Sequence, residues 1–223
     1  MIKHYSSKII GLGKYLPKSK VTNDDLSTLM DTSNDWILER TGIEERRFIA
    51  KDSVEGTASM GVKAAQLAID RAGISKDDID LIVFATLSPD YYFPGSGVLV
   101  QDIMGIGTCP ALDVRNQCSG YIYALSVADQ YIRTGTYKNV LVIGSEHHSG
   151  GLDLTTRGRT VSVIFGDGAG AAIVSRHENP EEGVLSTHLH SEGKHAKELS
   201  LIGPSTKKWV HEVFENYDPN DPD

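Results

Sequence analysis

The chain has 223 residues, with 22 Lys and Arg against 30 Asp and Glu, a formal net charge of −8 and 39% hydrophobic residues. This length and composition are ordinary for a globular protein with a sizeable buried core, and they exclude a disulfide-stapled miniature. An acidic chain repels the phosphate backbone overall, so a nucleic-acid-binding protein is disfavoured.

The two cysteines, Cys109 and Cys118, are too few for a disulfide framework and are typical of a reducing compartment. The N-terminus lacks the apolar stretch of a signal peptide, and the apolar runs are far too short to span a bilayer. These features predict a cytoplasmic protein with no membrane partner.

Two short helices are expected first along the chain. Thr22-Asn23-Asp24-Asp25 resembles a capping box, and Ser33 can cap a helix over residues 34–40. Apolar runs then alternate with amphipathic stretches. Buried strands are predicted at 79–85, 111–114, 140–143 and 171–174. This alternation of strand and helix predicts a layered α/β fold.

Two longer helices are predicted between these strands. In residues 58–72, Met60, Ala64, Leu67 and Ala68 share one helical face before Gly73. In residues 119–133, the shared face holds Ile122, Leu125, Ala128 and Ile132.

Two glycine clusters invite a nucleotide-binding interpretation that their neighbours do not support. Gly11-Leu12-Gly13 runs into Pro17 rather than a helix, and the cluster at 166–170 leads into a strand. We expect these glycines to allow tight turns or close backbone approach instead.

Histidine pairs give no metal site by themselves. His188 and His190 share a strand face, but no third ligand is nearby, so a structural zinc is not predicted. His147 and His148 follow a strand end, where functional groups of α/β proteins gather. Adjacent residues of an extended segment point in opposite directions, so at most one of them lines a site.

Cys118 lies between a predicted strand and the start of an amphipathic helix. Free backbone N–H groups and the positive end of the helix dipole favour a thiolate there, and Ser119 and Gly120 leave room for a substrate. Position alone leaves two interpretations open, a nucleophile or a buried inert cysteine. Cys109 has no such helix and is expected to be inert.

Trp36 and Arg40 are four residues apart on a short predicted helix and therefore share a face. An indole and a planar guanidinium can sandwich a flat ring such as adenine. A simple stacking pair on the surface explains the same spacing.

Several segments together resemble the β-ketoacyl-acyl-carrier-protein synthase III family of thiolase-fold condensing enzymes, over residues 8–193. The matching segments are 31–37, 40–43, 118–121, 124–131 and 165–172. The resemblance implies a layered α/β/α/β/α thiolase-like fold. Residues 1–190 are expected to form its N-terminal half, and residues 191–223 an acidic connection towards a C-terminal half outside this sequence.

The resemblance also implies a coenzyme A site. Trp36 and an arginine of Arg157-Gly158-Arg159 match the pair that clamps the coenzyme A adenine, and register counted back from Phe165 favours Arg159. Arg40 matches an arginine that contacts the phosphate or base.

By the same resemblance Cys118 is the acyl-accepting nucleophile, and Phe93 reaches across a homodimer to bound the partner's acyl pocket. The implied reaction moves an acyl group from acyl-coenzyme A to Cys118 and condenses it with malonyl-acyl-carrier protein. Coenzyme A enters as a thioester substrate, and no metal or redox cofactor is implied. Dimerisation is expected through the strand 111–114 and the Phe93 loop.

Other interpretations stay open. The family's His and Asn for the condensation step lie in the C-terminal half, which a separate chain could supply. Without them the chain is a half that binds acyl-coenzyme A or a partner subunit without turnover. A hydroxymethylglutaryl-coenzyme A synthase or polyketide-type condensation would use the same cysteine. The Arg115-Asn116-Gln117 lead departs from the small residues of acetyl-primed enzymes, which leaves a different or longer primer open.

Overall fold

The structure, a computed structural model, describes residues 5–196, 198 and 199. The chain divides into two compact units, one up to Thr187 and one from His188. In the described part of the second unit a single 3-10 turn spans Gly193–His195. Most of the predicted connection 191–223 lies outside the described residues, so its role stays a prediction.

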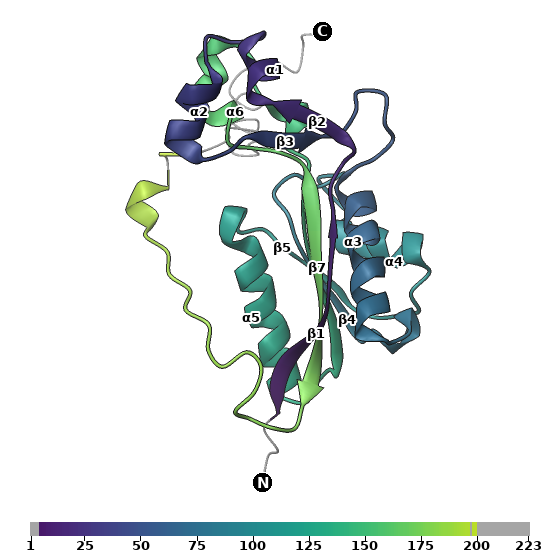
Figure 1. The fold of residues 1–223 in the computed structure, drawn as a ribbon. Coiled ribbons are helices and arrows are strands. Elements are labelled where there is room, and N and C mark those ends of the chain that lie inside the picture. Colours follow the sequence, from purple (N-terminus) through teal and green to yellow (C-terminus); the bar gives the residue numbers. More distant parts are fainter. Residues whose placement is uncertain (1–4, 197, 200–223) are drawn as a thin grey trace, which may run out of the picture. The chain divides into compact units, whose positions relative to one another are not determined.

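The first unit is built on a five-stranded mixed sheet with the order β1-β7-β6-β4-β5 (Figure 1). β4 is parallel to β5 and β6, whereas β7 is antiparallel to β6 and β1. The strands are β1 (Ser6–Tyr15), β4 (Leu81–Ala85), β5 (Ala111–Val114), β6 (Asn139–Glu146) and β7 (Gly168–His177).

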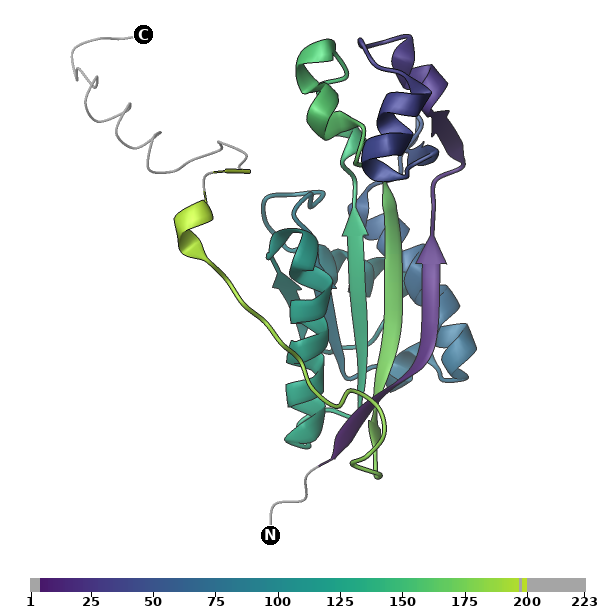
Figure 2. The same ribbon diagram turned by 60° about the vertical axis from the view of Figure 1, so that its left-hand side comes forward.

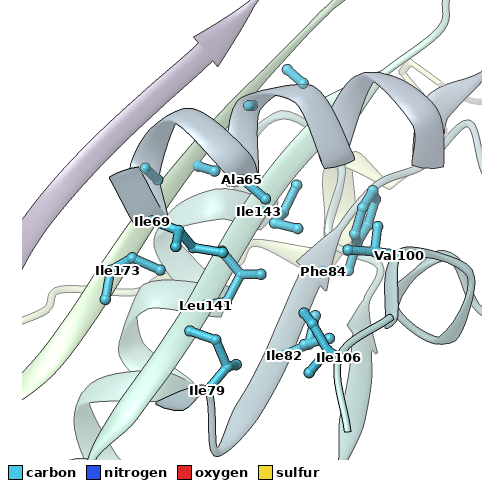
Figure 3. Close-up of a cluster of buried hydrophobic side chains, with 14 of the residues drawn as sticks. Ala65, Ile69, Ile79, Ile82, Phe84, Val100, Ile106, Leu141, Ile143 and Ile173 are labelled. Atoms are coloured by element: carbon cyan, nitrogen blue, oxygen red, sulfur yellow. The ribbon is translucent and has the colours of Figure 1, made fainter. Parts of the chain in front are cut away.

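Helices cover both faces of this sheet (Figures 1 and 2). α3 (Thr57–Ala72) and α4 (Ser96–Met104) lie on one face and α5 (Gly120–Arg133) on the other. The side chains of β4 alternate between the two faces of the sheet, so both faces carry apolar residues that a helix must cover. Ile82 and Phe84 belong to the α3/α4 core (Figure 3), whereas Leu81 and Val83 belong to the α5 core.

A smaller layer lies beyond one end of the sheet. Its elements are the antiparallel strands β2 (Ser19–Thr22) and β3 (Glu45–Phe48) and the helices α1 (Asn23–Ser27), α2 (Asn34–Thr41) and α6 (Arg159–Ser162). They enclose the apolar side chains Leu26, Met30, Ile37 and Val163. Buried Arg46 of β3 donates to Asn23 Oδ1 at 2.9 Å and to Val163 O at 3.0 Å, which links β3 to α1 and to the end of α6. Burial lowers the pKa of Arg46.

Most of the predicted elements are confirmed. Thr22 and Asp25 form the capping box of α1, and the Ser33 hydroxyl accepts from Trp36 N at 3.1 Å at the start of α2. The four predicted strands and both long helices are present, with shifted ends. β1, β2, β3 and α4 were not predicted.

Two details of the predicted core are wrong. Ile122 is 48% exposed, because the buried face of α5 runs through Ala124, Ala128 and Ile132 instead. β5 is an edge strand of the sheet rather than a buried one, and its Leu112 is 40% exposed. Local apolar character therefore overstated the burial of both elements.

The first glycine cluster allows the close backbone approach that was predicted. A Cβ atom on Gly11 would lie 2.2 Å from Ala68 O, and one on Gly13 would lie 1.9 Å from Ala64 O. β1 thus packs directly on the backbone of α3. The second cluster leads into a strand, as predicted, because Gly168 and Gly170 belong to β7. None of the helices in the described ranges has the length and apolar character needed to cross a bilayer.

Candidate active site

Cys118 lies at the junction of β5 and α5. A 3-10 turn over Gln117–Ser119 follows the loop after β5, and α5 begins at Gly120. The thiol is exposed, which contradicts the interpretation of Cys118 as a buried inert residue. Its position at the start of a long helix is the one predicted, with the free N–H groups of the first turn nearby.

The Cys118 side chain lines a cavity of about 560 Å³. The cavity lies where the three parallel strands end, because the segments after β4, β5 and β6 all contribute to its wall. Ligands of open α/β sheets bind at such carboxyl ends. The wall is formed by Ala85, Leu87, Gln117, Cys118, Tyr121, Gly144, Ser145, Glu146, His148, Ile164, Phe165, Gly166 and Gly170.

Glu146, which sequence analysis did not single out, organises one side of this cavity. Its carboxylate accepts from Leu87 N at 3.0 Å and from Ser88 N at 3.1 Å, and also from the hydroxyls of Thr86 and Ser88. The end of β6 thereby holds the turn after β4 in place. No local signal in the sequence could have identified Glu146, because all its partners come from the neighbouring strand's loop.

The Gly166–Gly170 motif has a structural role through Asp167. Its buried carboxylate accepts from Ile49 N at 2.7 Å, from Ser149 N at 2.8 Å and from the Ser149 hydroxyl at 2.5 Å. These bonds join the segment after β3 to the segment after β6. Phe165 and Gly166 are thereby placed in the cavity wall.

Of the two adjacent histidines, only His148 lines the cavity among the residues that the structure describes. Its ring stacks on Phe165, with 4.7 Å between centroids and 14° between planes. This agrees with the prediction that at most one member of the pair lines a site. Within the described ranges, no group of three or more His, Cys, Asp or Glu side chains is placed to hold a metal ion.

Trp36 has two guanidinium groups over its indole. The central carbon of Arg40 lies 4.5 Å from the ring centroid, and that of Arg159 lies 4.7 Å away. The Arg40 contact is the simple stacking pair considered above, because no gap for a flat ring remains at that distance. Arg159, at the start of α6, is brought here by tertiary packing.

Two hydrogen bonds join the segment before α2 to the start of α6. Asp31 N donates to Thr156 Oγ1 at 2.9 Å, and Arg159 Nη1 donates to Asp31 O at 2.5 Å. Arg159 Nε is buried and has no partner among the described residues. Arg159, the arginine that the register favoured, is thus in contact with Trp36.

Arg157 is oriented differently from Arg159. Its side chain is 89% exposed, and its Nε donates to Asp153 at 2.6 Å. Hydrogen bonds from the Thr155 hydroxyl and then from Arg157 lower the pKa of Asp153 to about 2. Of the two arginines in Arg157-Gly158-Arg159, Arg159 is therefore the one that lies over Trp36.

Two further predicted positions lie outside the cavity wall. Phe93 is 82% exposed and stands beside Tyr92 in the loop before α4. Cys109 is half-buried, and burial raises the pKa of its thiol. The structure therefore brings Cys118 to the cavity and groups Trp36, Arg40 and Arg159, but leaves Phe93 apart.

Comparison with known proteins places this arrangement in a family. Residues 112–193 match the family model of 3-oxoacyl-(acyl-carrier-protein) synthase III, a synonym of β-ketoacyl-acyl-carrier-protein synthase III. The synthase III of Aliivibrio fischeri is 49% identical over 217 residues, which cover 93% of this chain and 67% of that protein.

Solved structures agree. The synthase III of Pseudomonas aeruginosa superposes with a TM-score of 0.82 at 31% identity, over 91% of this chain and 62% of that one. The priming β-ketosynthase of the R1128 polyketide pathway gives a TM-score of 0.75 at 33% identity, over 81% and 53% of the two chains. The chain thus spans between about half and two thirds of these proteins and has the thiolase-like α/β fold. It belongs to the 3-oxoacyl-(acyl-carrier-protein) synthase III family.

Proposed function

We propose that this protein is an acyltransferase that accepts an acyl group from acyl-coenzyme A on Cys118 and condenses it with malonyl-acyl-carrier protein. One observation carries the proposal. An exposed cysteine at the start of a long helix lines a cavity at the carboxyl ends of the parallel strands, in a chain of this family. The product is a β-ketoacyl thioester, formed at the start of fatty-acid synthesis or of a related lipid pathway.

In the first half-reaction the Cys118 thiolate attacks the thioester carbonyl carbon. A carbon–sulfur bond forms to Cys118, the bond to the coenzyme A sulfur breaks, and coenzyme A leaves as a thiolate that takes up a proton. The Cys118 backbone N–H and the N–H groups of the first turn of α5 are suited to hold the oxyanion of the intermediate.

In the second half-reaction the malonyl group loses carbon dioxide, and the resulting carbanion attacks the acyl-Cys118 carbonyl. The Cys118 thiolate leaves and is regenerated. In the family a His and an Asn in the C-terminal half stabilise the enolate. We therefore assign this step to an assembly that includes those residues, on the same polypeptide or on a separate chain.

Acyl-enzyme formation tests the proposal directly. The protein is incubated with acyl-coenzyme A thioesters of increasing chain length, and peptide mass spectrometry locates any acyl group. We expect a thioester on Cys118. Folded protein that acquires no acyl group from any donor contradicts the proposal and favours a half that binds without turnover.

The cluster of Trp36, Arg40 and Arg159 is proposed to hold coenzyme A. For a base to stack on Trp36 in the family's manner, the Arg159 guanidinium moves off the indole and closes over the base. Trp36→Ala should weaken coenzyme A binding by about 1–3 kcal/mol, the range for base–aromatic stacking. Isothermal titration calorimetry measures the change.

Arg157 supplies a matched control for this clamp. Arg159→Ala should also weaken coenzyme A binding, whereas Arg157→Ala should leave it unchanged, because Arg157 is exposed and paired with Asp153. An unchanged dissociation constant for Trp36→Ala would make the indole a surface stacking partner only.

We further propose a homodimer formed through β5. Among the described strands β5 pairs on one side only, and its Leu112 is exposed. The Phe93 loop precedes α4, the helix that packs on β5. Sedimentation velocity should report a dimer of the 24.3 kDa chain. Leu112→Lys should shift it towards monomer, and a wild-type monomer would contradict the proposal.

We place the protein in the cytoplasm, as its cysteine content predicts.

A second candidate is priming in polyketide synthesis, which the likeness to the R1128 ketosynthase favours. The Cys118 step is the same in both, so the acceptor distinguishes them. A product carried by a polyketide carrier protein, and none by the fatty-acid carrier protein, would select the second candidate.

A further inference from the structure

Arg46 is a buried charged residue that the proposed reaction does not use. Only 6% of its surface is exposed. Its guanidinium donates to Asn23 Oδ1 at 2.9 Å, to Val163 O at 3.0 Å and to Val21 O at 3.4 Å. All three acceptors are neutral oxygens. Burying a charge among neutral acceptors is unfavourable, and an apolar side chain of similar length would avoid that cost.

Asn23 extends the contact from Arg46 to both ends of α2. A guanidinium can only donate, so the Asn23 oxygen faces Arg46 and leaves the amide NH2 group for other acceptors. That NH2 group donates to Asn34 Oδ1 at 3.1 Å and to Ile43 O at 2.7 Å. Asn34 is the first residue of α2, and Ile43 follows the Gly42 that ends the helix.

The second arm of the guanidinium holds the end of α6, because Val163 directly follows that helix. α2 and α6 lie beside each other in the small layer (Figures 1 and 2). They carry the cluster proposed to bind coenzyme A, with Trp36 on α2 and Arg159 at the start of α6. Arg159 Cζ lies 4.7 Å from the centroid of the indole, so the geometry of this pair depends on the spacing of the two helices.

Apolar packing alone would leave this spacing loosely defined. The four buried apolar side chains of the layer hold its elements together, but apolar contacts are non-directional. Two hydrogen bonds at Asp31 also join the two segments, and both are exposed, so water competes for them. The bonds from Arg46 to Asn23 and Val163 are buried, and the planar guanidinium fixes their directions.

β3 is held in place by contacts that do not involve the Arg46 side chain. Its backbone pairs with β2. Arg47 O accepts from Asp167 N at 2.8 Å, and Ile49 N, just after the strand, donates to the Asp167 carboxylate at 2.7 Å. Replacing the Arg46 side chain should therefore leave β3 in place and loosen only what the guanidinium holds.

We propose that Arg46 is a positioning residue of the coenzyme A site, which sets the spacing between Trp36 on α2 and Arg159 on α6. This inference rests on the proposed function, which assigns coenzyme A to those two side chains. Arg46 acts through the helices and not by touching the ligand. It therefore governs binding of the nucleotide end of the donor and not the chemistry at Cys118.

Two donors separate these effects. Butyryl-coenzyme A carries the adenine nucleotide, whereas S-butyryl-pantetheine has the same thioester and arm without it. Acylation of Cys118 is followed by mass spectrometry over a range of donor concentrations, and isothermal titration calorimetry gives the dissociation constant of coenzyme A.

In Arg46→Met, an unbranched apolar side chain replaces the guanidinium. Coenzyme A should bind about tenfold more weakly, within the range for one base stacked on an aromatic ring. The half-saturating concentration of butyryl-coenzyme A should rise by the same factor, with the maximal rate unchanged. Acylation by S-butyryl-pantetheine should equal that of the wild type.

Arg47→Met is the matched control. Arg47 is the next residue of β3, but its side chain is 33% exposed and donates to Lys18 O and Glu45 instead of α2 or α6. This variant should bind coenzyme A as the wild type does. Arg46→Lys should give an intermediate affinity, because an ammonium keeps the charge but lacks the planar fork that donates to both acceptors.

Asn23→Ala tests the connection to α2 without changing a charge. It should weaken coenzyme A binding as Arg46→Met does, and the double variant should be no weaker than either single one, because the two residues act in series. Thermal melts confirm that each variant is folded. If Arg46→Met does not fold, Arg46→Lys and Asn23→Ala provide the same comparison.

The outcomes are distinguishable. Wild-type protein that neither binds coenzyme A nor acquires an acyl group overturns the proposed function together with this inference. Folded Arg46 and Asn23 variants with wild-type affinity leave the proposed function intact and overturn this inference. An equal loss with both donors also overturns it, because Arg46 would then support the fold in general. Wild-type affinity in Arg46→Lys alone would assign the effect to charge and overturn the positioning role.

Discussion

Cys118→Ala is expected to abolish transfer of an acyl group from coenzyme A while leaving the protein folded. The thiolate is the nucleophile of the reaction, and no neighbouring group replaces it, so transfer should fall at least about a thousandfold, to background. The side chain is exposed. Its truncation should therefore change the free energy of unfolding by no more than about 0.5 kcal/mol. Intact-protein mass spectrometry measures the first effect and urea denaturation the second.

Cys109→Ala is the matched control. Cys109 carries the same functional group but lies outside the cavity wall, and burial raises the pKa of its thiol, which disfavours the thiolate. Acyl transfer should be retained in this variant. If Cys118→Ala instead forms the acyl-enzyme at the wild-type rate, the nucleophile is another residue.

Gly13→Ala, which adds a single methyl group to β1, is expected to lower the stability of the protein strongly. The added carbon would lie 1.9 Å from Ala64 O and 2.7 Å from Ala68 N, both backbone atoms of α3. Backbone cannot turn aside as a flexible side chain can, so the strand or the helix must shift. We expect a loss of about 3 kcal/mol or more in the free energy of unfolding, at the upper end for overpacked cores. The midpoint of urea denaturation reports it.

Gly170→Ala controls for the change from glycine to alanine within the same sheet. Gly170 lies on β7 opposite Lys14, next to the register position of Gly13, and no atom lies within 4 Å of an added Cβ. Its stability should be unchanged or slightly higher, because glycine weakens a strand interior. Equal denaturation midpoints for Gly13→Ala and the wild type would disprove the direct packing of β1 on α3.

Local patterns were sufficient for the elements whose stability is decided within a few residues. The capping box at Thr22, the cap at Ser33 and the apolar spacing of α3 all depend on neighbours along the chain. β1 was not predicted for the opposite reason. Its glycine-rich sequence forms a strand through pairing with β7 and packing on α3, both distant in sequence.

Some features of the site could likewise be predicted from the sequence, whereas others depend on the fold. The strand-to-helix position of Cys118 could be read from the order of elements, and the resemblance named Trp36, Arg40 and Arg159. The exposure of Cys118 is a property of the fold, as is the placement of Phe93 outside the cavity. Glu146 had no sequence signal at all, because its importance comes from the loop after β4 that its carboxylate holds.

The sequence by itself determined the α/β class, the main helices, the position of the cysteine at a helix start and the family resemblance, because periodicity, caps and motifs are local. Only the tertiary structure showed that Arg159, which the register favoured, lies over Trp36, and only it decided which histidine faces the cavity. Arg159 is placed by its bond to Asp31 O, and His148 by stacking on Phe165. Both contacts join residues from different elements, and such contacts form only when the elements pack together.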